Sequence, residues 1–340
     1  MTDPAPASAP ATFPSAPPMP VAEFRGIVTQ IEDAVATVMV GQGAIVRDVL
    51  ISLIGGGHVL LEGVPGLGKT MLVRTLADAL DLHFSRIQFT PDLMPADITG
   101  TNLLLEDSAG RKQFAFQPGP IFANLVLADE INRATPKTQS ALLEAMAEHQ
   151  ATVANEIHPL ASPFFVLATQ NPLEMEGTYP LPEAQLDRFF FKLIVPFPSA
   201  DDLKEIVRRT TLPTPPATSS VASGETIKQM GLMARQVPIA SAVTDYVVRL
   251  TLATHPTEPA PPEVVRRYVR YGVSPRGAQS IVLGAKIRAL IEGRLNVSFE
   301  DVRTVALPAL RHRLILNFDA ESAGVTADAV LSELLAALPE

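Results

Sequence analysis

The stretch Gly63–Thr70 constrains this chain more than any other, because it matches the pattern G-x-x-x-x-G-K-T. It follows the apolar run Val59–Leu61, which is typical of a buried strand. It precedes a segment with apolar residues at helical spacing from Leu72 to Leu80. A strand, a glycine loop and a helix in this order predict a loop that binds the phosphates of a nucleotide. A glycine-rich turn that matches by accident is the alternative, and the full context disfavours it.

The loop suits phosphate for physical reasons. Glycines let several backbone N–H groups converge on anionic oxygens, and the helix N-terminus adds a partial positive charge. Lys69 is expected to reach the outer phosphates as a point charge, and Thr70 to offer its hydroxyl to Mg²⁺, which prefers hard oxygen ligands. The predicted nucleotide-binding residues here are Gly63, Val64, Pro65, Gly66, Leu67, Gly68, Lys69, Thr70 and Met71.

Composition narrows the class of protein. The 340 residues suffice for about two domains, and a net charge of −9 disfavours sequence-independent binding of nucleic acid, although a local basic patch is compatible with it. The absence of cysteine excludes disulfides, thiolate catalysis and cysteine-bound zinc. No apolar run approaches about 18 residues and no secretory signal is visible, so we expect a cytoplasmic protein without stable membrane insertion.

Helical patterns alternate with buried apolar strands over residues 22–198, which predicts a P-loop NTPase fold, an α/β domain with a three-layer parallel sheet. Residues 1–21 are rich in proline and alanine and are expected to form a disordered tail. Residues 88–100 are expected to form a structured loop, and 101–117 and 150–160 two β-hairpins. Most segments after 198 have helical spacing, so 199–340 is predicted to be an all-helical lid domain.

Two acidic residues follow the buried strand 125–128, where open α/β sheets place their ligands. Asp129 is expected to hold Mg²⁺ through water, and Glu130 to orient and deprotonate the water that attacks the γ-phosphate. A strand-end pair without a role is the alternative, which a complete phosphate loop nearby disfavours. Arg133 either senses the nucleotide at a subunit boundary or forms a structural ion pair.

Three further side chains are candidates, each with an ordinary alternative. Asn171 either holds the attacking water or a γ-phosphate oxygen, or closes a turn before Pro172. Arg188 either stabilises charge at a neighbouring subunit's nucleotide or forms a surface salt bridge, for example to Asp187. Arg276 begins a predicted lid helix, where a positive charge is slightly unfavourable, and this favours contact with phosphate on domain closure over a solvated arginine.

These stretches together resemble the MoxR-type AAA+ ATPases over about residues 22–320. The most specific are Gln88–Leu93 and Leu181–Phe189. The others are Gly63–Thr70, Gly119–Pro120, Asp129–Ala134, Ala168–Pro172 and Ser274–Arg276. The sequence departs from the family at Gly277, where alanine is common, and we expect this glycine to loosen the first turn of the lid helix without removing a contact group.

The resemblance implies an ATPase that uses ATP and Mg²⁺. It implies Walker A at 63–70 and Walker B at 125–130, with Thr70 and Asp129 as metal ligands. The implied catalytic residues are Lys69, Glu130, Asn171 as sensor 1 and Arg188 as arginine finger, with Arg276 as sensor 2. It further implies a homo-oligomeric ring, usually a hexamer, with ATP sites between subunits and two hairpin inserts facing the pore or surface. Family members are thought to remodel client proteins, often with partners that contain von Willebrand factor A domains.

An ATP-driven, chaperone-like remodeller of protein complexes is therefore the favoured function. The alternative is a nucleic-acid motor or loader on the same fold, which the acidic composition and the absence of a basic, aromatic-interleaved surface disfavour. A regulatory module that binds nucleotide without hydrolysis is disfavoured as well, because binding alone needs neither a general base nor an arginine finger.

Overall fold

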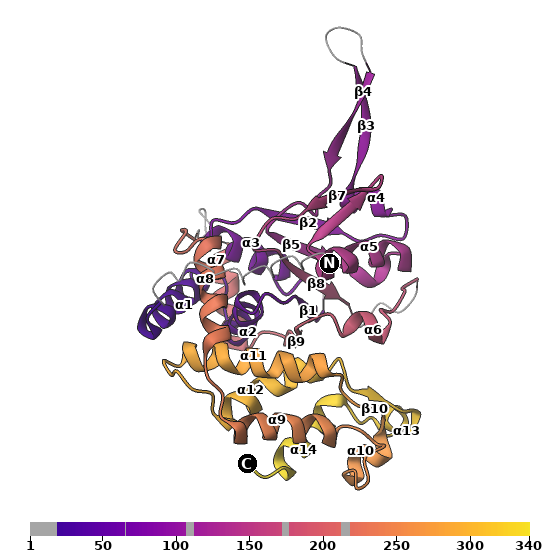
Figure 1. The fold of residues 1–340 in the computed structure, drawn as a ribbon. Helices are drawn as coiled ribbons and strands as arrows, with labels where there is room; N and C mark the ends of the chain where they lie inside the picture. Colours follow the sequence, from indigo (N-terminus) through magenta and orange to yellow (C-terminus); the bar gives the residue numbers. More distant parts are fainter. Residues whose placement is uncertain (1–18, 65, 107–111, 172–176, 212–217) are drawn as a thin grey trace, which may run out of the picture.

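The computed structural model describes residues 19–64, 66–106, 112–171, 177–211 and 218–340. Figure 1 shows an α/β body, a helical body beneath it, and a β-hairpin that projects away from both. The predicted fold class, a parallel α/β sheet with a helical C-terminal region, is confirmed. Of residues 1–21, predicted to be a disordered tail, residues 1–18 lie outside the described residues, whereas Val21 already begins the first helix.

The elements of the α/β body follow one another along the chain. They are α1 (Val21–Ala36), α2 (Gly43–Ile54), β1 (Val59–Glu62), α3 (Lys69–Ala79), β2 (Phe84–Gln88), α4 (Pro95–Thr99), β3 (Gly100–Glu106), β4 (Lys112–Pro118), β5 (Leu125–Asp129), the 3-10 helix η1 (Ile131–Arg133), α5 (Pro136–Glu148), β6 (Gln150–Val153), β7 (Glu156–Pro159), β8 (Phe165–Gln170), α6 (Glu183–Leu186) and β9 (Phe191–Ile194).

The C-terminal region is mostly helical. Its elements are α7 (Ala200–Thr210), α8 (Gly224–Gln236), α9 (Ser241–Ala253), α10 (Glu263–Tyr268), β10 (Val269–Tyr271), α11 (Pro275–Ile291), α12 (Phe299–Leu310), β11 (Ile315–Leu316), α13 (Phe318–Ala323) and α14 (Ala327–Ala337). α7 and α8 lie beside the α/β body in Figure 1, whereas α9 to α14 form the helical body beneath it. Within the described residues, no helix is both long and apolar enough to cross a membrane.

The central sheet has the strand order β2-β5-β8-β1-β9, and all its pairs are parallel. Gln88 pairs with Asp129, and Glu62 pairs with both Gln170 and Ile194. The carboxyl ends of the strands therefore meet along one edge, which we call the carboxyl edge. The amino ends meet along the opposite edge, the amino edge, where Val59 pairs with Phe191.

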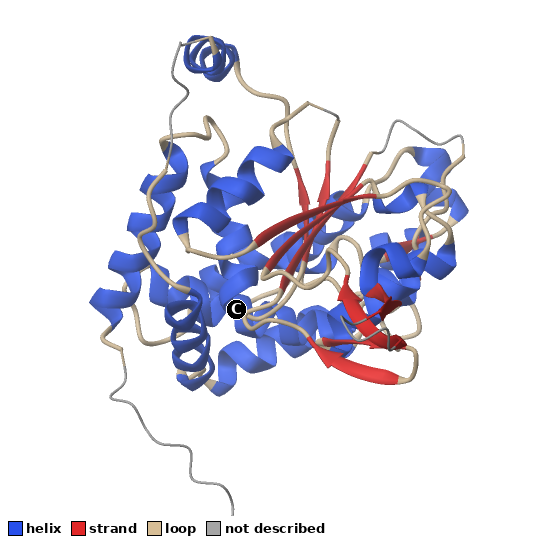
Figure 2. Cartoon of the chain, turned by 90° about the horizontal axis from the view of Figure 1, so that it is seen from above, coloured by secondary structure: helices blue, strands red, loops and turns tan. Residues whose placement is uncertain are grey.

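Helices cover both faces of this sheet (Figure 2). Successive strand residues point to opposite faces, and the apolar clusters follow that alternation. On one face, Leu60, Val126 and Val166 join a cluster with Leu142 and Met146 of α5. On the other face, strand residues join a cluster with α1, α2, α3 and the C-terminal helices; they include Val59, Leu61, Leu125, Leu127 and Leu167. Because both faces are buried, the strands are apolar at nearly every position.

Both hairpins predicted from the sequence are present. In the first, β3 and β4 pair from Gly100 with Pro118 to Glu106 with Lys112, and residues 107–111 between them lie outside the described residues. In the second, β6 pairs with β7. The hairpins touch each other through rings, because Phe116 of β4 stacks on His158 of β7 with centroids 3.8 Å apart.

Two expectations need correction. The stretch 88–100 is not only a loop, because α4 forms at its end: Pro95 suits the first turn, and the Asp97 carboxylate accepts a hydrogen bond from the Met94 backbone at 2.8 Å. The C-terminal region is not all-helical either, since β10 and β11 form a short antiparallel ladder. The Asn317 amide stabilises that ladder by donating to the Arg267 carbonyl at 2.8 Å.

Candidate active site

The phosphate loop lies at the carboxyl edge, between the end of β1 and the start of α3. Gly66 and Gly68 have φ angles of 84° and 76°, a left-handed conformation that residues with a Cβ rarely adopt. These glycines therefore produce the turn that places the N-terminus of α3 next to the phosphate-binding loop. Pro65 lies outside the described residues.

Lys69 is held at the centre of this loop. Its Nζ donates to the Gly63 carbonyl at 2.5 Å. Burial lowers the pKa of Lys69, and the carboxylates of Asp129, Glu130 and Glu62 oppose that shift. A partly buried ammonium group favours an anionic ligand that brings further hydrogen-bond acceptors.

The acidic strand end is tied to both neighbouring strands. The Thr169 hydroxyl of β8 donates to Asp129 Oδ1 at 2.6 Å and accepts from the Glu130 backbone N–H at 2.8 Å. Arg86 of β2 pairs with Asp129 Oδ2 at 2.6 Å. Both carboxylate oxygens of Asp129 are therefore fixed from opposite sides.

Glu130 has a strained backbone and two side-chain partners. Its φ of 57° lies in the left-handed region, which non-glycine residues rarely adopt and which recurs at functional sites. Gln88 Nε2 and Arg133 Nη1 both donate to Glu130 Oε2, at 2.9 and 3.1 Å. Arg86 in turn donates to Gln88 Oε1 at 2.7 Å. The ion-pair interpretation of Arg133 therefore holds within this chain.

One cavity of about 500 Å³ brings these groups together. Its lining includes the predicted residues Gly66, Gly68, Lys69, Thr70, Met71, Asp129, Glu130 and Asn171. Asn171 is buried, at 6% exposure. The lining also includes residues to which the sequence analysis gave no role, namely Arg74, Arg86, Gln88 and Thr169. Strand alternation could have found two of them, because Gln88 ends β2 opposite Asp129 and Arg86 precedes it by two positions, on the same face.

A second cavity, of about 460 Å³, adjoins the phosphate loop. It lies between the end of α1 and the start of α2, where Met39, Gly41 and Gln42 line it. Gln42 Nε2 donates to the Leu67 carbonyl at 3.0 Å, which fixes this segment to the loop.

Arg188 and Arg276 lie elsewhere, at the amino edge. Arg188 precedes β9, and its Nη1 donates to the Leu143 carbonyl at 2.5 Å rather than to a carboxylate. Asp187 pairs instead with Arg313 at 2.8 Å and accepts a hydrogen bond from the Ser274 hydroxyl at 2.7 Å. This last bond brings the segment around Arg276 to the segment around Arg188.

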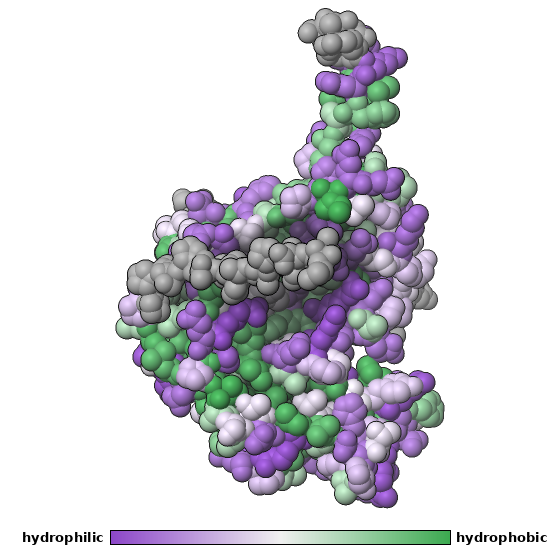
Figure 3. Space-filling model, in the orientation of Figure 1, coloured by the Kyte–Doolittle hydropathy of each residue, from purple (hydrophilic) through white to green (hydrophobic). Residues whose placement is uncertain are grey.

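Both arginines line one cavity of about 890 Å³ between the α/β body and α11, which we call the core–lid cavity. Neither lines the phosphate pocket of its own chain. Near this side of the molecule, Figure 3 shows the surface notched between α6 and the β10 region.

Gly277 has a packing reason that the sequence did not reveal. It is buried in the first turn of α11, which forms regularly from Pro275. A Cβ at this position would come within 2.3 Å of Val273 Cγ1 and 3.2 Å of Arg313 Cδ. Glycine therefore permits the close approach that places Arg313 beside Asp187.

Comparisons with known proteins agree with this geometry. Residues 58–191 match the model of the ATPase family associated with various cellular activities, and residues 263–334 match the AAA lid domain. Chaperone MoxR1 of Mycobacterium tuberculosis is 44% identical over 308 residues, covering 90% of this chain and 81% of that protein. Protein MoxR of Methylorubrum extorquens is 32% identical over 310 residues, covering 86% and 89% of the two proteins.

A solved structure gives the same result for the fold. The crystal structure of a candidate ATPase from Cytophaga hutchinsonii superposes with a TM-score of 0.86 at 39% identity, and covers 94% of this chain and 96% of that one. The family models, the relatives over most of their length and the phosphate loop beside its acidic strand end agree. The chain belongs to the MoxR-type AAA+ ATPases and is an ATP hydrolase.

Proposed function

We propose that this chain hydrolyses ATP between the subunits of a homo-oligomeric, hexameric ring and uses the energy to remodel client proteins. The observation that carries the proposal is the separation of the predicted groups. Lys69, Glu130 and Asn171 share one pocket, whereas Arg188 and Arg276 line another cavity at the opposite edge of the same sheet. A single subunit then offers two half-sites, which only a neighbouring subunit can complete.

At the carboxyl edge, each side chain has a role suited to its place. The loop's N–H groups and Lys69 bind the phosphates of ATP. Glu130 orients a water and takes its proton as the oxygen attacks the γ-phosphate, and Asn171 holds that water or a γ-phosphate oxygen. In the structure Glu130 is bonded to Gln88 and Arg133, so its carboxylate must exchange a partner before it acts as a base.

The pocket also fits Mg²⁺. Thr70 and Asp129 line it together, and hydroxyl and carboxylate oxygens are the hard donors that this ion prefers. Bound there, Mg²⁺ would neutralise charge on the β- and γ-phosphate oxygens. Arg86 is the present counter-ion of Asp129, so we expect it to shift when the metal binds. The adenine is proposed to enter the adjoining cavity, near Met39 and Gln42.

At the amino edge, Arg188 and Arg276 are proposed to reach the adjacent subunit's triphosphate together. The Ser274–Asp187 hydrogen bond supports this pairing, because it connects the two segments directly. The sequence alone suggested that Arg276 closes onto its own subunit's nucleotide. The shared cavity favours the neighbour's nucleotide instead, since Arg276 does not line its own phosphate pocket.

The projecting hairpin supports a remodelling role. Leu104 and Phe114 are cross-strand partners, and they are 55% and 74% exposed. Leu103 and Leu105 lie on the other face and are also exposed, so each face carries exposed apolar side chains. Figure 3 shows hydrophobic residues on the visible side of this hairpin. Exposed apolar surface of this kind suits contact with another protein. A client or a partner with a von Willebrand factor A domain is proposed, and the cytoplasm is the proposed location.

A nucleic-acid motor is the second candidate. The net charge of −9 speaks against it, because nucleic-acid binding rests on neutralising phosphates. ATPase activity that DNA stimulates, and that falls with salt, would favour the motor over the remodeller.

A complementation experiment tests the shared site. Glu130→Gln removes the base and Arg188→Ala removes the distant cation, so each protein alone should lose turnover, by about 10²–10⁴-fold for the base and about 10³–10⁵-fold for the arginine. Rings mixed from the two variants contain some interfaces with an intact Glu130 and an intact Arg188. Steady-state ATPase assays of the mixture should therefore recover part of the activity.

A mixture as inactive as its components would contradict an intersubunit site. Glu321→Gln serves as the matched control, because this exposed carboxylate of α13 lies outside the phosphate pocket and the core–lid cavity, and its loss should leave turnover unchanged. The Glu130→Gln protein with ATP is also the trap for the client. The remodelling role fails, while the ATPase stands, if two results are found together. The captured protein does not change the turnover of the wild type, and Leu104→Ser and Phe114→Ser in the hairpin do not change turnover either.

A further inference from the structure

The core–lid cavity carries more positive charge than the proposed ATP contact needs. Among the described residues that line it, the cations are Arg188, Arg235, Arg276, Lys286 and Arg313, and the one carboxylate belongs to Asp187. That carboxylate already pairs with Arg313. The remaining cations surround the cavity without a carboxylate from the described part of this chain.

Those cations bond mainly to carbonyl oxygens. Arg235 Nη2 lies 3.5 Å from the Gly55 carbonyl, and Lys286 Nζ donates to the Arg235 carbonyl at 3.1 Å. A carbonyl satisfies a donor but carries no net charge, so the repulsion among the cations persists. Burial and the charge of Arg235 lower the pKa of Lys286, which is the effect expected of two close cations without a counter-ion.

The spacing of the cations separates two ends of the cavity. Arg276 and Lys286 are on α11, ten positions apart, which is about 15 Å along a helix. Val282 and Leu283 lie between them, and Val247 and Val248 of α9 also line the cavity. The arrangement is an apolar groove with one cationic end at Arg276 and Arg188 and a second at Lys286 and Arg235.

Under the proposed function, the first end meets the adjacent subunit's triphosphate. The second end must then meet protein surface of the same neighbour, beside its nucleotide pocket. On this chain, the cavity next to the phosphate loop is lined by Glu32 and Asp33. Glu32 already pairs with Arg47 at 2.7 Å, whereas Asp33 is exposed and has no ion pair with any residue in the described ranges.

We propose that Lys286 and Arg235 form an intersubunit docking site for the acidic rim of the neighbour's nucleotide pocket, with Asp33 of the second copy as the carboxylate. The proposal rests on the proposed function, because it places the second cationic end in the same interface as Arg188. It explains why a cationic groove persists in a chain of net charge −9: the missing counter-charge lies on the opposite face of an identical copy.

Charge swaps test this contact. In the Glu130→Gln background with ATP, sedimentation velocity measures the assembly of the full chain. Lys286→Glu and Asp33→Lys should each weaken assembly at least about tenfold, because each puts like charges in contact across the interface. The double variant Lys286→Glu with Asp33→Lys should regain assembly to within about threefold of the parent, a difference below 1 kcal/mol.

Controls separate this contact from folding and from the ring itself. Lys286→Gln should weaken assembly less than Lys286→Glu, and Lys228→Glu should not weaken it, because Lys228 on α8 lies outside the cavity and pairs with Glu225. Binding of a fluorescent ATP analogue to the Lys286→Glu subunit should be unchanged. If Lys286→Glu does not weaken assembly, or if the double variant stays dissociated, this contact alone is overturned. A parent that stays monomeric with ATP overturns the ring and this contact together.

Discussion

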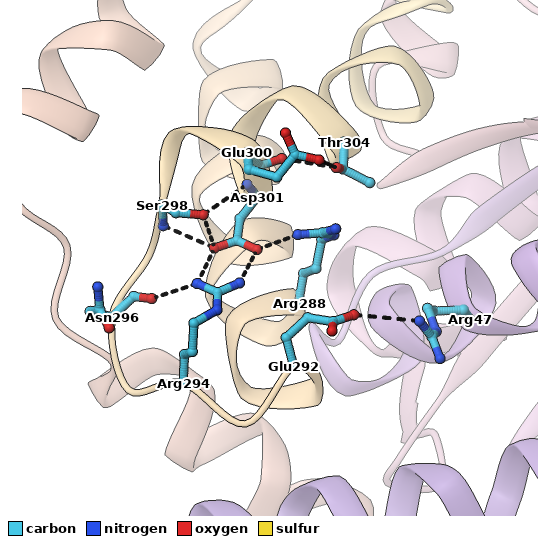
Figure 4. A network of polar contacts seen from close by, with 9 residues as sticks. All are labelled: Arg47, Arg288, Glu292, Arg294, Asn296, Ser298, Glu300, Asp301 and Thr304. Atoms are coloured by element: carbon cyan, nitrogen blue, oxygen red, sulfur yellow. Dashed lines mark hydrogen bonds and ion pairs between the residues drawn. The ribbon is translucent and has the colours of Figure 1, made fainter. Parts of the chain in front are cut away.

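Two groups of cations, one within the lid helices and one between the lid and the α/β body, have opposite surroundings. In the first, Arg288 and Arg294 both bond to Asp301, which is 0% exposed (Figure 4). Arg294 makes a bidentate pair with that carboxylate at 2.7 and 2.8 Å. Ser298 adds two more hydrogen bonds to Asp301 Oδ2, from its backbone N–H and its hydroxyl. Every partner of this cluster lies within the same subunit.

The second group lines the core–lid cavity and has the reverse arrangement. Arg188, Arg235 and Lys286 bond to backbone carbonyls, and Arg276 has no hydrogen bond to any residue that the structure describes. The comparison suggests a rule for this molecule. Arginines that share a buried carboxylate stabilise the fold, whereas arginines without one are available to bind an anion that does not belong to the same subunit. Stability and turnover should therefore respond to different variants.

The largest effect on folding is expected at the first cluster. Burial alone would raise the pKa of Asp301, but hydrogen bonds from Arg294, Ser298 and Arg288 outweigh it and hold that pKa below its usual value. Asp301→Asn should lower the free energy of unfolding by about 3 kcal/mol, because it breaks a buried ion-pair network and leaves two half-buried arginines without a counter-charge. Urea denaturation measures this loss.

The same variant should keep its turnover number per folded molecule under native conditions. Asp319→Asn is the matched control, because Asp319 is exposed in the first turn of α13 and its change should stay within about 0.5 kcal/mol. A loss of turnover in folded Asp301→Asn, without a loss of stability, would show that the first cluster is not merely structural.

The sequence predicted the carboxyl edge better than the amino edge, for a physical reason. The phosphate loop depends on contiguous residues, and strand ends meet at one edge in any parallel sheet, so Lys69, Asp129 and Asn171 could be brought together before the fold was known. The proximity of Arg276 to Arg188 depends on a contact across 87 residues, between Ser274 and Asp187. No local pattern encodes such a contact, so the sequence did not indicate that Arg276 lines the core–lid cavity together with Arg188.

Short-range propensity also misjudged some polar side chains. Thr135 and Ser274 each stand at the N-cap position of a helix, where their hydroxyls would ordinarily accept a hydrogen bond from the backbone. Neither caps through its side chain: the Thr135 hydroxyl lies 3.3 Å from that of Thr138, and Ser274 donates to Asp187. In both cases a tertiary or side-chain partner competes successfully with the backbone N–H.

A smaller effect, on catalysis alone, is expected at the second cluster. Arg276→Ala should reduce turnover by about 10²–10³-fold, the usual loss when one donor to developing charge is removed. The midpoint of thermal unfolding should not change, because Arg276 is exposed and makes no hydrogen bond to a described residue. ATPase assays and calorimetry on the same preparation check both halves.

Arg266→Ala provides the comparison variant, since Arg266 is an exposed arginine that pairs with Glu263 on α10, outside the core–lid cavity. It should change neither turnover nor the unfolding midpoint appreciably. Equal turnover in Arg276→Ala and Arg266→Ala would remove Arg276 from the site and weaken the contrast between the two clusters.

The smallest effect concerns Asp48, an intermediate case between the clusters. This half-buried carboxylate of α2 is attracted electrostatically by Arg311, Arg47 and Arg288. Its side chain nevertheless accepts no hydrogen bond from any residue in the described ranges. Burial raises its pKa to about 6, although the three arginines oppose the shift. Positive charge alone, without hydrogen bonds, does not offset the loss of hydration here.

The sign of the pH dependence follows from that raised pKa. The native state binds the proton more tightly than the unfolded chain, so the stabilisation from this group is complete at low pH and is lost as pH rises through about 6. Asp48→Asn should therefore stabilise the protein by about 1–3 kcal/mol at pH 8 and by almost nothing at pH 4. Subtracting wild-type unfolding free energies at each pH cancels the other titrating groups. A difference that is flat with pH would mean that the arginines do compensate Asp48, and that a counter-charge need not be hydrogen-bonded to stabilise this fold.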